Sequence, residues 1–204
     1  MKKTINLILK NDLYHAKWLN TLAYLEHIGS RKIIKSQNSR LLDYRTLKHI
    51  AEEARHALFL KKICKQNFNE SCPTFEHKYL LGGDGANKYF QKLDHYIHND
   101  LPRENHFFLN YLYVTFVIEE RALSIYTDYQ ALLTAKDYSF NLTPLLVEET
   151  QHLNEAKTLL ADNDADFMER IIKFSIIEKE LFADFINEVT RELDLHNAAG
   201  SIHA

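Results

Sequence analysis

Apolar residues recur every three to four positions along most of this chain, a spacing typical of α-helices that bury one face. Only 5 Gly and 3 Pro interrupt the pattern in 204 residues, whereas a β-protein of this length needs many more turn residues. We therefore expect an all-α fold. Six helices are predicted, over about Thr4–Lys35, Leu42–Lys65, Ala86–His98, Pro102–Ala135, Thr143–Leu160 and Asp166–Leu195, followed by a frayed tail over His196–Ala204.

Capping residues and helix breakers place the boundaries of these helices. Asp43 or Ser39 is a suitable cap for the second helix, and Pro102 suits the first turn of the helix that it begins. The stretch from Gln66 to Asp84 contains Gly and Pro and is less regular. Together with the short helix after it, this stretch forms a long crossover between two helix pairs. Because no linker or low-complexity tract is visible, we expect a single domain over residues 1–204.

The composition excludes several classes of protein. Hydrophobic residues make up 46% of the chain and the net charge is -3, which argues against disorder and against a basic nucleic-acid-binding surface. No run of 18 apolar residues is present, so we expect no membrane span. The short apolar run Ile5–Leu9 is too brief for a signal peptide, and 2 Cys suit a reducing compartment. These features predict a cytoplasmic protein.

Two of the predicted helices contain the same motif, Glu-Glu-x-x-His, at residues 52–56 and 148–152. Residues three positions apart lie on one face of a helix, so the second glutamate and the histidine of each motif can bind the same metal ion. These pairs are Glu53 with His56 and Glu149 with His152. A single Glu-x-x-His is most often a pair of surface residues, but two on separate helices favour a metal site.

Two further glutamates lie on apolar faces of the other long helices. Glu119 shares its face with Leu112, Phe116 and Leu123, and Glu26 shares its face with Leu19, Leu22 and Ile33. A carboxylate in an apolar stripe is costly unless it is paired or binds a metal. The two glutamates also precede the motif glutamates by similar intervals, as expected for two antiparallel helix pairs. We therefore predict a metal site formed by Glu26, Glu53, His56, Glu119, Glu149 and His152.

Four other residues are candidates for supporting this site. Glu52 and Glu148 can each accept a hydrogen bond from the outer N–H of a metal-bound histidine, although both can equally be solvated surface charges. His49 lies one turn before Glu53 on the same face; a histidine there is more often a hydrogen-bonded core residue, and a further ligand is the alternative. Tyr126 lies two turns after Glu119; a redox or proton-donor role is one interpretation, and simple core packing is the other.

The six predicted ligands resemble those of the ferritin-like di-iron carboxylate superfamily, in which two helices each contribute Glu-x-x-His and two others each contribute Glu. The resemblance covers residues 5–160. The ligand intervals and the run Ile118-Glu119-x-x-Ala122-x-x-x-Tyr126 are most similar to those of aldehyde-deformylating oxygenases. The long interval from His56 to Glu119 is also similar to that of bacterial multicomponent monooxygenases. The paired Cys-x-x-Cys motifs of many rubrerythrin-like proteins are absent from the sequence.

This resemblance implies a ferritin-like four-helix bundle with a long crossover between its second and third helices, an additional C-terminal helix, and two iron ions. Carboxylate and imidazole ligands also suit manganese. The expected function is activation of O2 to oxidise a small or apolar organic substrate. Electrons would come from an external donor, because no flavin or nicotinamide fingerprint is present. Catalytic residues beyond the metal centre, and the assignment of bridging and terminal ligands, stay open.

Two alternatives belong to other functional classes. One is iron handling, meaning ferroxidase activity, storage or peroxide detoxification. The other is a helical interaction protein with a vestigial metal site. A storage cage requires many copies of the chain, and we expect a monomer or dimer instead.

Overall fold

The computed structural model describes residues 1–37, 40, 42–69, 71–103 and 106–200. Within these residues the chain is helical and contains no β-strand, as the sequence pattern predicts. The α-helices are α1 (Lys2–Ile8), α2 (Asp12–Ser36), α3 (Tyr44–Asn67), α4 (Gly83–Asp100), α5 (His106–Ala135), α6 (Thr143–Asn163) and α7 (Phe167–Gly200). A single 3-10 turn, η1 (His77–Tyr79), lies between α3 and α4.

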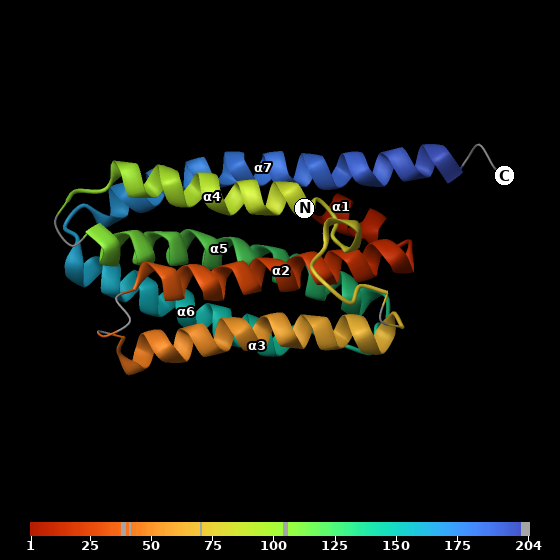
Figure 1. Cartoon of the computed structure of the whole chain (residues 1–204), viewed down its shortest axis with the longest axis horizontal. Helices are drawn as coiled ribbons and strands as arrows, with labels where there is room; N and C mark the ends of the chain where they lie inside the picture. The colour runs from red at the N-terminus through yellow and green to blue at the C-terminus, as the bar shows by residue number, and fades with distance from the viewer. Residues whose placement is uncertain (38–39, 41, 70, 104–105, 201–204) are drawn as a thin grey trace.

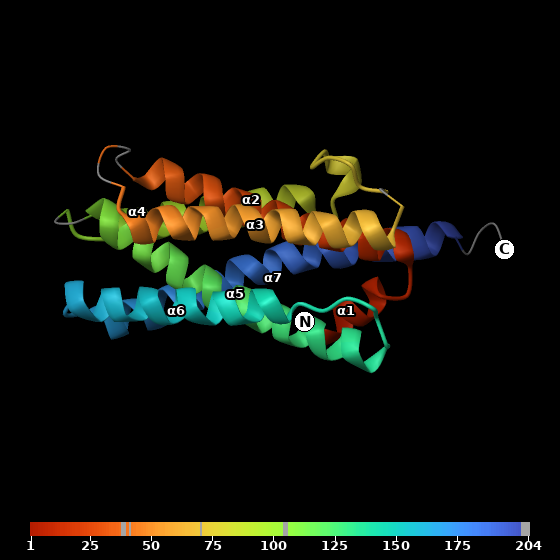
Figure 2. The same ribbon diagram turned by 90° about the horizontal axis from the view of Figure 1, so that it is seen from below.

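The helices form two antiparallel pairs that face each other, with a third pair alongside. Helix α2 packs against α3, and α5 packs against α6. Figure 2 shows these two pairs on opposite sides of the molecule. Helices α4 and α7 pack against each other and cover α5, as Figure 1 shows at the top of the view. The structure is therefore an all-helical bundle with an additional two-helix layer.

The prediction of one first helix over Thr4–Lys35 is wrong, because the chain turns after Ile8 and begins again at Asp12. The side-chain oxygen of Asn11 accepts hydrogen bonds from two backbone N–H groups in the first turn of α2, at 2.9 and 3.2 Å. Asparagine is a favoured residue at this position because it satisfies these otherwise unpaired donors. Ile5 is buried, and it falls on the same helical period as the apolar positions of α2. The apolar pattern therefore gave no sign of the break between α1 and α2.

Other predicted boundaries shift by a few residues. Asp43 caps α3 by accepting a hydrogen bond from the backbone N–H of Thr46 at 2.8 Å, whereas the alternative cap, Ser39, lies outside the described residues. Helix α5 begins at His106, so the prediction that Pro102 begins this helix is wrong. Helix α7 continues to Gly200, so the first part of the predicted tail is helical and its last four residues lie outside the described part.

Polar residues of α2 fix the irregular segment between α3 and α4. The Asn20 side-chain amide donates to the carbonyl oxygens of Thr74 and Tyr79, each at 2.9 Å. The Thr21 hydroxyl accepts a hydrogen bond from the backbone N–H of Leu81 at 2.8 Å. Asn20 and Thr21 are fully buried, and these bonds compensate for their desolvation. The crossover is therefore held against the bundle by specific bonds.

A buried ion pair joins the two-helix layer to the bundle. Arg121 of α5 donates two hydrogen bonds to the Glu178 carboxylate of α7, at 2.8 and 2.7 Å. Tyr89 of α4 donates a third to the same carboxylate at 2.6 Å. The Arg121 guanidinium also lies 4.3 Å from the ring centroid of Phe182. Glu178 is only 3% exposed, so its charge depends on these partners.

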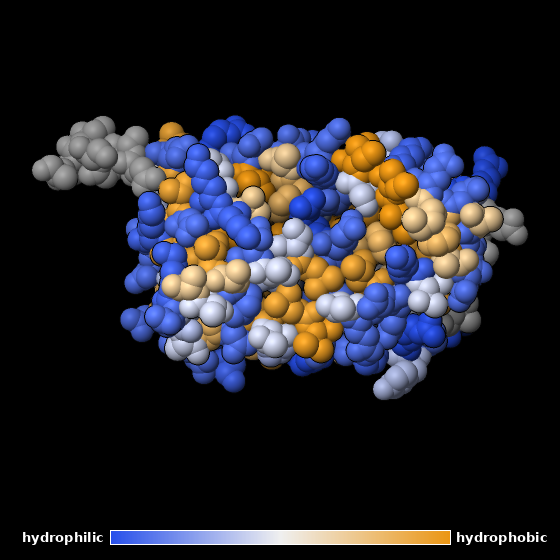
Figure 3. Space-filling model, turned by 180° about the vertical axis from the view of Figure 1, so that it is seen from behind, coloured by the Kyte–Doolittle hydropathy of each residue, from blue (hydrophilic) through white to orange (hydrophobic). Residues whose placement is uncertain are grey.

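No helix in the described part of the chain has both the length and the apolar character needed to cross a bilayer. Exposed apolar side chains do occur one turn apart on α7, at Met168, Ile172 and Ile176. On the face opposite to that of Figure 1, apolar patches are interspersed with polar side chains (Figure 3).

Candidate metal centre

The six predicted ligands converge between the two helix pairs. Glu26 comes from α2, Glu119 from α5, and the two Glu-x-x-His pairs come from α3 and α6. None of the six residues is more than 7% exposed. The motif spacing predicted only that the Glu and His of each motif lie on one face of their helix. In the fold, the faces of both motif helices point into the same buried region.

The inner nitrogens of the two motif histidines face the carboxylates. His56 Nδ1 lies 2.9 Å from an oxygen of Glu149 and 3.8 Å from oxygens of Glu26 and Glu53. His152 Nδ1 lies 3.2 Å from the other oxygen of Glu149 and 3.5 Å from an oxygen of Glu53. Each imidazole therefore presents one nitrogen to several carboxylate oxygens at once.

The donor atoms form two groups that share Glu53. In each group, one atom from every residue lies within 4.8 Å of the others. Two ligands on opposite sides of an ion, each about 2.1 Å from it, lie about 4.2 Å apart, so both groups are near the size that a metal ion requires. The groups are Glu26, Glu53, His56 and Glu149, and His49, Glu53, Glu119 and His152.

The outer nitrogens of both motif histidines are held by the first glutamate of the opposite motif. His56 Nε2 lies 2.6 Å from Glu148 of α6, and His152 Nε2 lies 3.0 Å from Glu52 of α3. Arg55 in turn donates to Glu148 at 2.9 Å. A carboxylate on the outer nitrogen fixes the orientation of a ligating imidazole. Glu52 and Glu148 thus contact the outer nitrogens of the motif histidines, and their role beside metal-bound histidines stays a prediction.

Tyr126 and His49 also lie at the cluster. Tyr126 is buried and donates a hydrogen bond from its hydroxyl to Glu26. Burial, followed by the charge of Glu26, raises the pKa of this phenol well above its usual value. His49 Nε2 lies 3.4 Å from oxygens of both Glu53 and Glu119. Both residues are thus in contact with predicted ligands.

The cluster concentrates negative charge in the interior. Burial and the charges of Glu149 and Glu53 raise the pKa of Glu26 to about 8. Burial and the charge of Glu149 raise the pKa of Glu119 well above its usual value. Glu53 Oε1, His56 Nδ1 and Glu149 Oε1 are buried without a well-directed hydrogen bond. Unpaired buried polar atoms and repelling carboxylates are costly, and bound cations would remove both costs.

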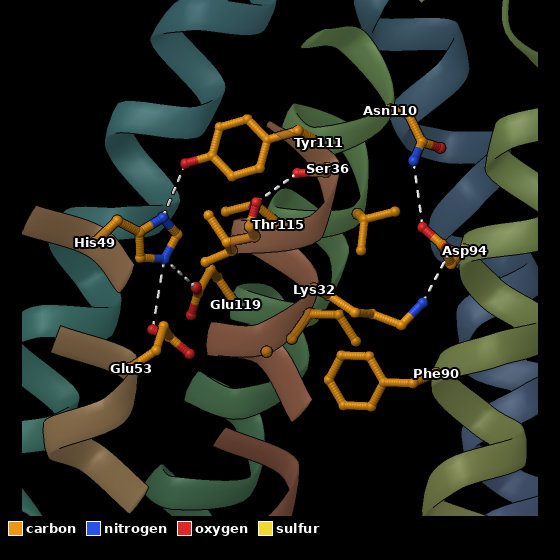
Figure 4. A pocket seen from close by; sticks show the side chains of 14 residues that line it. Lys32, Ser36, His49, Glu53, Phe90, Asp94, Asn110, Tyr111, Thr115 and Glu119 are labelled. Carbon is orange, nitrogen blue, oxygen red and sulfur yellow. Dashed lines mark hydrogen bonds and ion pairs between the residues drawn. The ribbon is translucent and has the colours of Figure 1, made fainter. Parts of the chain in front are cut away.

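Two small cavities border the cluster on the side of α2, α4 and α5. Each has a volume of about 40 Å³. Figure 4 shows the first, where His49, Glu53 and Glu119 lie opposite Phe90, and a Lys32–Asp94 ion pair of 2.8 Å lies on its wall. The second, more apolar cavity is bordered by residues that include Leu22, Ile125, Tyr126 and Phe182. Since one water needs about 10–15 Å³ by this measure, each cavity accommodates only very small molecules.

Gly29 lies where both cavities meet Glu53, and a Cβ atom there would lie 3.1 Å from Glu53 Oε2. We expect Gly29→Ala to stabilise the metal-free protein by about 0.5–1 kcal/mol, because alanine is the better residue inside a helix. The same substitution should weaken Mn(II) binding about tenfold, because a metal-bound Glu53 cannot move away from the new methyl group. Thermal unfolding of the metal-free protein and Mn(II) titration measure the two effects. An unchanged Mn(II) affinity would show that the close contact does not constrain the site.

Fold and site together define an all-helical protein with buried carboxylates and imidazoles that can hold metal ions. Comparisons of the chain with family models, curated proteins and solved structures find no match.

The sequence did not indicate all of the surroundings of the site. The hydroxyl of Tyr111 in α5 lies 2.9 Å from His49 Nδ1. In the sequence, Tyr111 looks like an ordinary core residue. The one feature of the sequence that could have linked Tyr111 to the site is its position two turns before Glu119 on the same helix. The Lys32–Asp94 pair joins α2 to α4, and its pairing depends on a docking angle that the sequence does not specify.

Proposed function

We propose that this chain is a ferritin-like di-metal carboxylate oxidoreductase that activates O2 to oxidise a small or apolar organic substrate. The observation that carries the proposal is the pair of buried Glu/His groups that share Glu53. The same ligand types, from two Glu-x-x-His helices and two single-Glu helices, are typical of ferritin-like di-iron and di-manganese proteins.

Ligand chemistry favours iron or manganese. Carboxylate oxygens with imidazole nitrogens suit these ions, while the thiolates typical of structural zinc sites do not occur in either group. Charge supports the presence of two divalent cations, because four carboxylates balance them when the imidazoles are neutral. When bound, two redox-active ions would supply electrons to O2, and an external donor would restore them.

The chain's own residues have defined roles in this proposal. Glu148 and Glu52 hold the two motif imidazoles with their inner nitrogens directed at the centre. Tyr126 donates a hydrogen bond to the Glu26 carboxylate and so holds a proton beside it. The apolar wall of the second cavity, which includes Ile125 and Phe182, excludes bulk water from the centre.

An anaerobic experiment tests the proposal. Protein loaded with two equivalents of Fe(II) per chain should develop a near-ultraviolet or visible absorption band when it is mixed with O2. A variant that lacks two ligands, Glu149→Gln/His152→Gln, is the matched control and should show only the slow oxidation of free Fe(II). If the wild-type protein gives no optical change beyond that of the control, oxygen activation at this centre is refuted.

Iron handling is the second candidate, and the small size of the two cavities favours it, because O2 or peroxide fits where a larger substrate does not. The two functions differ when Fe(II) is in excess. A ferroxidase continues to oxidise and retain many iron ions per chain, whereas a substrate oxidase stops after its two ions react. Light scattering of the same sample distinguishes a large shell from a monomer or dimer.

A further inference from the structure

His49 is arranged like the two motif histidines. Its Nε2 lies 3.4 Å from Glu53 Oε1 and 3.4 Å from Glu119 Oε1, inside the cluster. Its Nδ1 lies 2.9 Å from the Tyr111 hydroxyl on the far side of the ring (Figure 4). The histidines His56 and His152 show the same division, with one nitrogen toward several carboxylates and the other held by an oxygen. An oxygen-anchored outer nitrogen is characteristic of histidines that ligate metal.

The distances argue against a purely supporting role for this histidine. A histidine that only supports a carboxylate ligand donates a short hydrogen bond to it, usually at 2.7–2.9 Å. The outer nitrogens of the two motif histidines do lie closer to their carboxylates, at 2.6 Å for His56 with Glu148 and 3.0 Å for His152 with Glu52. His49 Nε2 instead lies at the same longer distance from two carboxylates. This spacing fits an ion placed among the three groups.

We propose that His49 is a seventh ligand of the centre, binding through Nε2 the ion that is shared with Glu53, Glu119 and His152. Its Nδ1–H donates to the Tyr111 hydroxyl, which fixes the tautomer. The inference rests on the proposed metal centre and makes the two sites unequal. One site has two imidazoles and two carboxylates, and the other has one imidazole and three carboxylates. Imidazole suits iron, whereas carboxylates suit manganese, so the two sites differ in preference.

Proton NMR of the Co(II)-loaded protein tests this assignment. Each ligating imidazole retains one N–H, which the paramagnetic ion shifts far outside the normal range and which disappears in D2O. We expect three such signals in the wild-type protein, and we expect His49→Gln to remove one of them. The matched control is His95→Gln, which replaces an exposed α4 histidine bonded to Asn99 and should leave all three signals.

Each outcome has one meaning. Two shifted signals in the wild-type protein overturn the assignment of His49 while leaving the metal centre intact. No shifted signals, together with no bound Co(II), refute the metal centre itself. Affinity alone does not discriminate, because loss of either a ligand or a supporting residue weakens metal binding by about tenfold or more. The wild-type count decides the question even if His49→Gln fails to fold.

Discussion

Saturation with Mn(II) is expected to raise the midpoint of thermal unfolding by about 15–30 °C. An ion present at a thousandfold excess over its dissociation constant stabilises the native state by about 4 kcal/mol, so two ions contribute about 8 kcal/mol. For a chain of this size, each kcal/mol corresponds to about 2–4 °C. The physical reason is that bound cations neutralise buried carboxylates: burial first, and then the charges of neighbouring glutamates, raise the pKa values of Glu26 and Glu119. Differential scanning calorimetry with and without Mn(II) measures the shift.

The control for this prediction is a variant in which the repulsion is reduced and the ligands are lost. Glu149→Gln/His152→Gln removes donors from both ligand groups, so Mn(II) should shift its midpoint by no more than a few degrees. The shift is measured from the variant's own metal-free midpoint, because the loss of Glu149 also removes a close partner of His56. Equal Mn(II) shifts in the variant and the wild-type protein would mean that the stabilising ions bind elsewhere.

Replacement of Arg121 by methionine is expected to cost about 3–5 kcal/mol of unfolding free energy at pH 7, because it leaves the buried Glu178 carboxylate without its counter-charge. Of the polar contacts among the described residues, the hydrogen bond from the Tyr89 hydroxyl would then remain on that carboxylate. Chemical denaturation of the metal-free protein measures the loss. The loss of unfolding free energy should become smaller as the pH is lowered. An unpaired buried carboxyl has a raised pKa in the folded state, and burying its neutral, protonated form costs less free energy.

A second substitution tests the reason for this loss. Arg121→Met/Glu178→Leu replaces the whole ion pair with apolar side chains of similar size and should recover most of the lost stability. Metal binding should be unaffected in this double variant, because neither residue belongs to the ligand groups. If the double variant is as unstable as Arg121→Met alone, the loss arises from packing against Phe182 and not from the unpaired charge.

The buried Glu/His cluster was predictable from sequence because helical phase is a local property. Glu26 and Glu119 were identified by their places on apolar faces, and no long-range information was needed. Glu178 passes the same test, because it shares its face of α7 with Phe174 and Phe182, but the sequence did not indicate its partner Arg121 on a different helix. The packing of α7 against α5 creates that contact, and the apolar period of either helix does not specify how the two helices dock.

Helix ends were predicted less accurately, because the apolar period can continue across a break between two helices. The break at Asn11 depends on a short-range capping bond, but Ile5 and Ile8 remain buried on the same side as the apolar face of α2. The role of His49 was also open, because a histidine one turn before a ligand can equally be a core residue. The proposed ligand role depends on contacts with Tyr111 and Glu119 of α5, which the sequence of α3 does not specify.

The most direct test of the central claim is anomalous X-ray diffraction from crystals grown with Fe(II) or Mn(II), recorded on both sides of each metal absorption edge. The account predicts two anomalous peaks inside the bundle, one among Glu26, Glu53, His56 and Glu149 and the other among His49, Glu53, Glu119 and His152. Anomalous peaks that occur only at the protein surface, or none at all in crystals of metal-saturated protein, would contradict it.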